Sequence, residues 1–277
     1  MAYKILLDKN NAPLNRLLLA RIQLDASCPS VSFDTHGETL LYNLVGTAHV
    51  YDNDRYIGAI GGRRVVTEPS TDIVRFPCLP SGMTFHVTLT LQGYAADFLV
   101  ASCLPGPMSP TLLPSSSSYQ SVLTSVSITP YVHKNDCHYH DVGYGAYRRT
   151  VCEVPTPHGS ELHCGQTISD GKNGTWSSWP SHAAPEELER YAEHEEAFFC
   201  LTSGYFIMRM EGKYCTGKEA KELREIRNGE ALATPLGNHE ICVSPGDVGV
   251  YIWIYLSFLK KKYNAFANES ISKVYIK

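Results

Sequence analysis

The segment 176–182 reads Trp-Ser-Ser-Trp-Pro-Ser-His and ends in His182, with Glu196 and then His239 further along the chain. Each of the three lies in or beside a strand-like segment. Two imidazoles and one carboxylate are a usual ligand set for a divalent metal inside a small β-barrel. Barrel sites of this kind often carry a second histidine two positions after the first, where this chain has Ala184. The segment therefore predicts a barrel metal site from which one ligand is absent.

Short β-type segments extend outward from this site in both directions. Several alternate apolar and polar residues over four to eight positions, which is typical of half-buried strands. They cover residues 40–50, 74–76, 84–91, 98–102, 150–154, 197–202, 205–210, 231–233 and 250–258. Helical turns are expected only at 186–193 and 218–227, both highly charged. The pattern predicts an all-β protein made of barrels or sandwiches.

A boundary between two similar halves is expected between residues 104 and 130. This stretch contains four prolines, followed by the serine run 115–118. Gly37-Glu38-Thr39 and Gly165-Gln166-Thr167 each precede or open a strand-like segment, a weak internal repeat. The chain of 277 residues is long enough for two domains, predicted at 1–128 and 129–277.

Composition argues against several classes of partner and compartment. The formal net charge of −4 gives no electrostatic reason to expect nucleic acid or an anionic membrane. No apolar run reaches the roughly 18 residues of a membrane span. The first residues lack the layout of a signal peptide. Nine scattered cysteines without a CxxC pair fit reduced thiols. We expect a cytoplasmic protein.

The chain resembles the bicupin sugar isomerases, namely the 5-deoxy-glucuronate isomerase of inositol catabolism and the hexuronate ketol-isomerase of pectin breakdown. The resemblance runs over roughly residues 36–258. Its motifs are Leu44 to Ala48, Gly62 to Pro69, Pro80-Ser81-Gly82, Gly143 to Val151, Trp176 to His182, Glu195 to Phe199, Ile226 to Pro235, and Gly237-Asn238-His239. The family's His-Lys-His-Asp is here His182-Ala183-Ala184-Pro185.

The resemblance implies two tandem cupin barrels (double-stranded β-helix, jelly-roll), the first without a metal site. In the second barrel it implies a divalent ion at His182, Glu196 and His239. In the family this ion is usually assigned as zinc, so the resemblance implies zinc here, with manganese or iron as alternatives. It would polarise a sugar carbonyl while a proton moves between adjacent carbons through an enediolate. His194 is a further metal candidate, because a strand would place it on the same face as Glu196; an exposed loop histidine is the simpler alternative.

Arg149, Arg209 and Tyr255 are candidates for binding a sugar-acid substrate; the two guanidinium groups suit a carboxylate. The spacing does not identify the catalytic base. The expected function is a metal-dependent aldose–ketose isomerase of a deoxy-uronate, in a chain that could form a homo-oligomer. A non-catalytic bicupin that binds a sugar or another small molecule is the alternative, favoured by Ala184. Two histidines and one glutamate also occur in non-haem iron oxygenases, which rank last.

Overall fold

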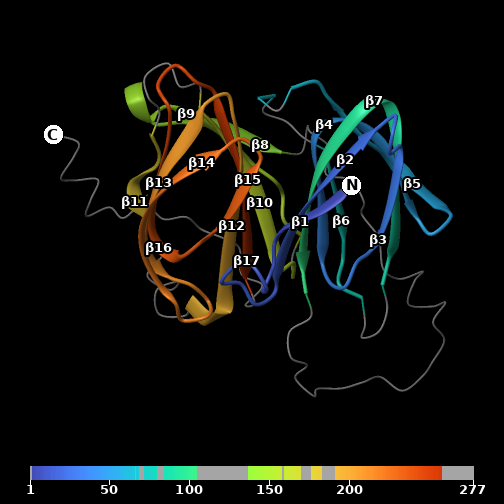
Figure 1. Cartoon of the computed structure of the whole chain (residues 1–277), viewed down its shortest axis with the longest axis horizontal. Coiled ribbons are helices and arrows are strands. Elements are labelled where there is room, and N and C mark those ends of the chain that lie inside the picture. Colours follow the sequence, from blue (N-terminus) through green and yellow to red (C-terminus); the bar gives the residue numbers. More distant parts are fainter. Residues whose placement is uncertain are drawn as a thin grey trace.

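The first half of the chain forms a single antiparallel sheet that curls into a barrel (Figure 1). The computed structural model describes residues 2–65, 67–68, 72–79, 84–104, 137–157, 159–169, 176–182 and 191–257. The strands are β1 (Tyr3–Leu7), β2 (Leu17–Asp25), β3 (Ser30–Asp34), β4 (Thr39–Asp52), β5 (Arg55–Arg63), β6 (Ile73–Phe76) and β7 (His86–Cys103). Strand β7 pairs with β2, β3 and β4 and so joins most of the sheet.

The second half forms a barrel from a six-stranded and a four-stranded sheet. The six-stranded sheet contains β8 (His138–Val142), β9 (Arg149–Glu153), β10 (Leu162–Ser169), β12 (His194–Thr202), β15 (Glu230–Thr234) and β17 (Gly249–Ser257). The four-stranded sheet contains β11 (Trp176–His182), β13 (Tyr205–Lys213), β14 (Glu219–Arg227) and β16 (Leu236–Val243). Two short 3-10 turns, η1 (Gly145–Tyr147) and η2 (Tyr191–Glu193), connect strands.

The two barrels lie side by side and share a third apolar core (Figure 1). Alternate side chains along the same strand enter either this shared core or the interior of a barrel. Along β12, Ala197 and Phe199 belong to the shared core, whereas Phe198 and Cys200 belong to the interior of the second barrel. Because successive side chains of a strand point to opposite faces, His194 and Glu196 face that interior as well.

The all-β prediction is confirmed, and each predicted strand corresponds to an observed one. Two details differ. The segments predicted at 84–91 and 98–102 belong to one continuous strand, β7, which serves both ends of the first sheet.

The helical turn predicted at 218–227 is wrong, because these residues form β14. This strand pairs only with β13 and carries its charged side chains on the exposed edge of the sheet. Of the other predicted helical turn, residues 186–190 lie outside the described residues, and η2 occupies 191–193.

The predicted boundary at 128/129 also lies outside the described residues. Within the described ranges, no helix is long and apolar enough to cross a membrane. All nine cysteines are described, and none forms a disulfide.

Candidate metal centre and active site

Strand β12 carries Glu196 into the interior of the second barrel. The side chain is buried, with 5% of the residue exposed. Its Oε2 accepts a hydrogen bond of 3.1 Å from the hydroxyl of Thr234, the residue opposite it on β15. A buried carboxylate is costly unless other groups satisfy it, so Thr234 both stabilises Glu196 and fixes its orientation.

His239, on β16, faces the same interior from the opposite sheet. The ring is buried and lies edge-on to Phe198, with 5.5 Å between centroids and 83° between planes. Phe198 is two residues after Glu196 on β12, so His239 contacts a side chain on the same face of this strand as Glu196. The structure thus brings two of the three predicted metal ligands into one buried interior.

His182, the third predicted ligand, pairs with His239 in the β11–β16 register. The register shifts between Ser177 and His182, and Ser178 has a φ of 54°. For His182 itself only the backbone is described. Its position opposite His239 is compatible with a shared site.

His194 is a buried strand residue, so the exposed-loop alternative is wrong. Its Nδ1 lies 2.8 Å from the hydroxyl oxygen of Tyr255, a predicted substrate-binding residue, and the two rings stack at 5.5 Å. On the other side of Tyr255 lies the ring of His163, at 6.1 Å between centroids. These three side chains form one polar layer at the Glu196 end of the barrel.

A second polar layer lies around Tyr251. The hydroxyl of Tyr251 is hydrogen-bonded to Ser177, and its ring stacks on Phe198 at 5.0 Å. Arg149 lies close enough to Tyr251 to interact electrostatically. Partial burial lowers the pKa of Arg149, and Tyr251 opposes that shift. Tyr251 lies four residues along β17 from Tyr255, roughly 13 Å at the usual rise of a strand, so this layer is separate from that of His194 and Tyr255.

Arg209 does not lie with the other candidates. It is on β13 between Met208 and Met210, which are buried in the barrel, so its own side chain points outward. There its guanidinium binds Glu240 at 3.0 Å and Glu211 at 2.8 Å. These ion pairs on the outer face explain the presence of Arg209 without a role in substrate binding.

The donor set fits a divalent ion in its chemistry, since an imidazole and a carboxylate are both buried inside one barrel. Among the described side chains, which exclude that of His182, no group of three His, Cys, Asp or Glu converges on one point. Of the predicted ligands, Glu196 and His239 are buried in this interior, and His182 is described by its backbone alone.

The segment before β9 contains a second histidine–cysteine cluster, but its members separate in the fold. Cys137 is buried in the core shared by the barrels, while His138 and His140 are exposed on β8. Their rings lie 5.9 Å apart. This arrangement gives no common site for the thiol and the imidazoles.

Four residues of this interior are not among the predicted site residues: His163, Thr234, Ser177 and Tyr251. A signal existed for His163, because β10 alternates strictly: Leu162 and Cys164 enter the shared core, and the odd-numbered residues face the barrel. Gly165 is part of that pattern. A Cβ at this position would lie 2.2 Å from the ring of Trp253.

Solved structures support the same architecture. An IolB-like protein from Salmonella typhimurium LT2 is 18% identical, with a TM-score of 0.70 over 97% of this chain and 93% of the other. Oxalate decarboxylase from Lactobacillus farciminis, in a formate complex, is 12% identical with a TM-score of 0.62, covering 98% and 85%. AerE from Microcystis aeruginosa is 13% identical with a TM-score of 0.52, covering 88% and 89%. No curated protein sequence matches the chain.

Together these observations define an all-β protein of two tandem cupin barrels with an ionisable interior in the second. The sequence model of the KduI/IolB family matches residues 9–270. The chain therefore belongs to the KduI/IolB family, whose members are sugar isomerases.

Proposed function

We propose that the protein is a metal-dependent aldose–ketose isomerase that acts on a deoxy-uronate such as 5-deoxy-glucuronate. The second barrel would supply the active site, with a divalent ion, zinc first among the alternatives, at His182, Glu196 and His239. The observation that carries the proposal is the burial of Glu196 and His239 in the interior of one barrel, where His239 contacts Phe198 on the same face of β12 as Glu196.

A bound divalent ion would supply Lewis acidity, which favours movement of a proton between the carbonyl carbon and its neighbour. The residues of the chain would prepare the site for this chemistry. Thr234 orients Glu196 through the hydrogen bond of 3.1 Å. Phe198 and Trp253 fill the space around the site and limit access of water. Arg149, at the Tyr251 layer, would bind the substrate carboxylate.

His194 is proposed as the residue that partly compensates for Ala184. It faces the same interior as Glu196, and its Nδ1 is occupied by the Tyr255 hydroxyl. A metal ion bound by His194 would be bound through the other ring nitrogen, Nε2. Fixing one ring nitrogen through a hydrogen bond is how metal-binding histidines are commonly oriented.

Metal analysis by elemental mass spectrometry, on untagged wild type and His239→Ala, tests the proposal. We expect about one zinc, manganese or iron per chain in the wild type and much less in the variant. Isomerisation of 5-deoxy-glucuronate and of 5-keto-4-deoxyuronate should follow the metal content. A wild type that stays metal-free after incubation with zinc, manganese and iron would contradict the proposal.

The second candidate is a non-catalytic protein that binds a sugar acid in the same barrel. Ala184, which has no metal-binding group, favours it. This candidate predicts that 5-deoxy-glucuronate binds without turnover and without metal. Calorimetric titration of metal-free protein with the sugar distinguishes it from the isomerase.

A further inference from the structure

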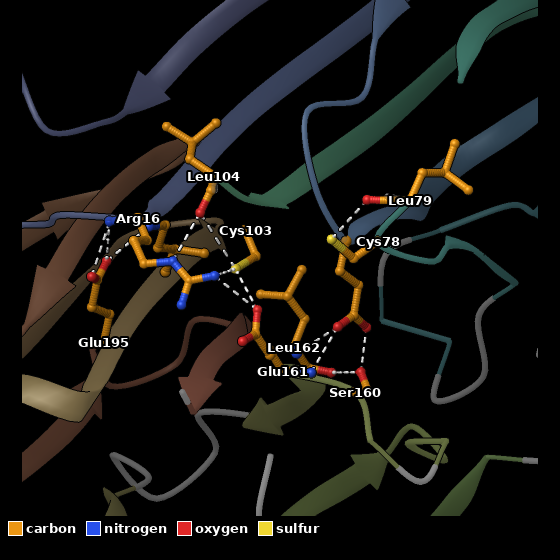
Figure 2. A network of polar contacts seen from close by, with 11 residues as sticks. Arg16, Cys78, Leu79, Cys103, Leu104, Ser160, Glu161, Leu162 and Glu195 are labelled. Carbon is orange, nitrogen blue, oxygen red and sulfur yellow. Dashed lines mark hydrogen bonds and ion pairs between the residues drawn. The ribbon is translucent and has the colours of Figure 1, made fainter. Parts of the chain in front are cut away.

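The start of β12 is held by a segment of the other barrel. The carboxylate of Glu195, a residue that is 2% exposed, accepts hydrogen bonds from three consecutive backbone N–H groups. The distances are 3.2 Å from Asn15, 3.0 Å from Arg16 and 2.8 Å from Leu17. Figure 2 shows Arg16, the middle of the three donors, beside Glu195. Charged acceptors make the stronger class of hydrogen bond, and three donors on one carboxylate fix both its position and its direction.

Glu38 is the reciprocal case: a carboxylate of the first barrel accepts hydrogen bonds from backbone amides of the second. Its Oε2 accepts hydrogen bonds from the backbone N–H groups of Glu161, at 2.7 Å, and Leu162, at 3.3 Å. Arg75 forms an ion pair with Glu38 and donates to the carbonyl of Leu162 at 2.8 Å. Each barrel thus offers one buried carboxylate to backbone amides of the other.

A third cross-barrel contact surrounds Arg16. Its guanidinium binds Glu161 at 2.9 Å and the carbonyl of Leu104 at 2.8 Å, next to Cys103 (Figure 2). The backbone of Arg16 therefore binds Glu195 while its side chain binds another part of the second barrel. Arg16 is therefore held through both its backbone and its side chain, so residues 15–17 form a rigid support for Glu195.

The first two residues of β12 need such a support. The ladder with β17 begins at His194, but the ladder with β15 begins only at Glu196. His194 and Glu195 are thus paired with a strand on one side only. Glu195 lies directly between the two inward-facing residues, His194 and Glu196. A shift of its backbone would move both of them.

We propose that Glu195 is a positioning residue: by binding the amides of residues 15–17, it fixes the start of β12 and thereby the metal-binding geometry of Glu196 and His194. This inference rests on the proposed metal site. It makes the N-terminal segment a structural part of an active site that lies wholly in the second barrel.

Cobalt(II) binding to the full-length, metal-free chain tests this inference, with Glu195→Gln as the variant. Glutamine retains the size of the side chain but loses the charge and one acceptor oxygen. We expect Co²⁺ affinity to fall by about 10- to 100-fold, the effect usual for groups that orient metal ligands, and the visible absorption bands to shift. Glu195→Asp keeps the charge with a shorter reach. It should give an intermediate loss and serves as the second variant if Glu195→Gln does not fold.

Tyr42→Phe is the matched control. It removes another buried hydrogen bond between the barrels, from the Tyr42 hydroxyl to Gln166 at 2.8 Å, without touching β12. Its Co²⁺ affinity and spectrum should equal those of the wild type. Unchanged affinity and spectrum in both Glu195 variants, with normal binding by the wild type, would overturn the inference and leave the proposed function intact. A wild type that binds no Co²⁺ would overturn both.

Discussion

The interiors of the two barrels differ, although both barrels are built from antiparallel strands. The first is filled by buried aliphatic and phenylalanine side chains from nearly every strand, among them Ile22, Val50, Val87 and Phe98. The second places His163, His194, Glu196 and His239 among its apolar residues. One barrel is packed as a core, and the other retains groups that can bind and exchange protons.

The buried charges of the first half of the chain sharpen this contrast. Among its described residues, the buried charged side chains are Glu38, Arg63 and Arg75, and all three bond to the second barrel. Buried ionisable groups are expensive unless they are paired. The buried charged side chains of the first barrel therefore bind the second barrel, whereas the second barrel has buried ionisable side chains in its own interior. The comparison suggests that the first barrel serves as a support and the second as the site.

The largest expected effect is on stability, from Phe98→Ala in the first barrel. Phe98 is fully buried, so truncation should lower the free energy of unfolding by about 3–5 kcal/mol. Urea unfolding measures the loss. The folded fraction should keep its full specific activity, because Phe98 lies in the interior of the first barrel, whereas Leu17 next to Glu195 belongs to the core shared by the barrels. Phe198→Ala should cost a similar amount and also reduce activity, since Phe198 contacts His239. Equal losses of specific activity in Phe98→Ala and Phe198→Ala would contradict the assignment of the active site to the second barrel.

Glu196→Gln should have the next largest effect, and on activity. Loss of a metal-binding carboxylate is expected to lower kcat/KM by at least about a hundredfold, equivalent to about 2.7 kcal/mol. Bound metal, measured by mass spectrometry, should fall in parallel. The first-barrel control is Thr39→Val, which removes the buried bond of 3.0 Å to Ser102. If Thr39→Val reduced metal content as much as Glu196→Gln, the assignment to the second barrel would fail.

Tyr255→Phe should cost less. It removes the hydroxyl that contacts His194 at 2.8 Å, and a single buried hydrogen bond contributes about 1 kcal/mol. Tyr42→Phe makes the same chemical change at the contact between the barrels and should cost a similar amount in thermal unfolding. Only Tyr255→Phe should alter isomerase activity. Identical isomerase activity in Tyr255→Phe and Tyr42→Phe would show that the contact between Tyr255 and His194 has no role in the reaction.

The smallest effects concern one turn on each barrel. Hydrogen bonds from Ser27 and then Cys28 lower the pKa of Asp25, and those from Ser244 and Ser203 lower the pKa of Asp247. A lowered carboxyl pKa stabilises the folded state above the unfolded value of about 3.9, and this stabilisation disappears as pH falls through the folded value.

Asp25→Asn and Asp247→Asn should therefore be slightly less stable than the wild type at pH 7 and equal to it at the acid end of the titration. Circular dichroism between pH 7 and pH 2 measures this convergence. A gap that persists at the acid end would show that another group is responsible. Because the two turns are alike, a large difference between the variants would indicate that the barrels unfold separately.

The sequence predicted those parts of the molecule that depend on local alternation. Strands such as β4, β12 and β17 have a pattern of their own. In the structure, alternation places Glu195 on the face opposite Glu196, where it accepts hydrogen bonds from residues 15–17. The charged strand β14 has no such pattern, because its position depends on pairing with β13. The contact between Glu195 and residues 15–17 could not be predicted either. Its donors are backbone amides, which every residue except proline possesses.

The hydrogen bonds to Glu195 join residues 178 to 180 positions apart, which has a consequence for synthesis. At about 5–20 residues per second, a ribosome needs roughly 10–40 s to extend the chain from Leu17 to Glu195. Throughout that interval the amides of residues 15–17 must be satisfied by water or by transient partners, including chaperones. Assembly of the second barrel is therefore completed by a segment that was synthesised well before β12.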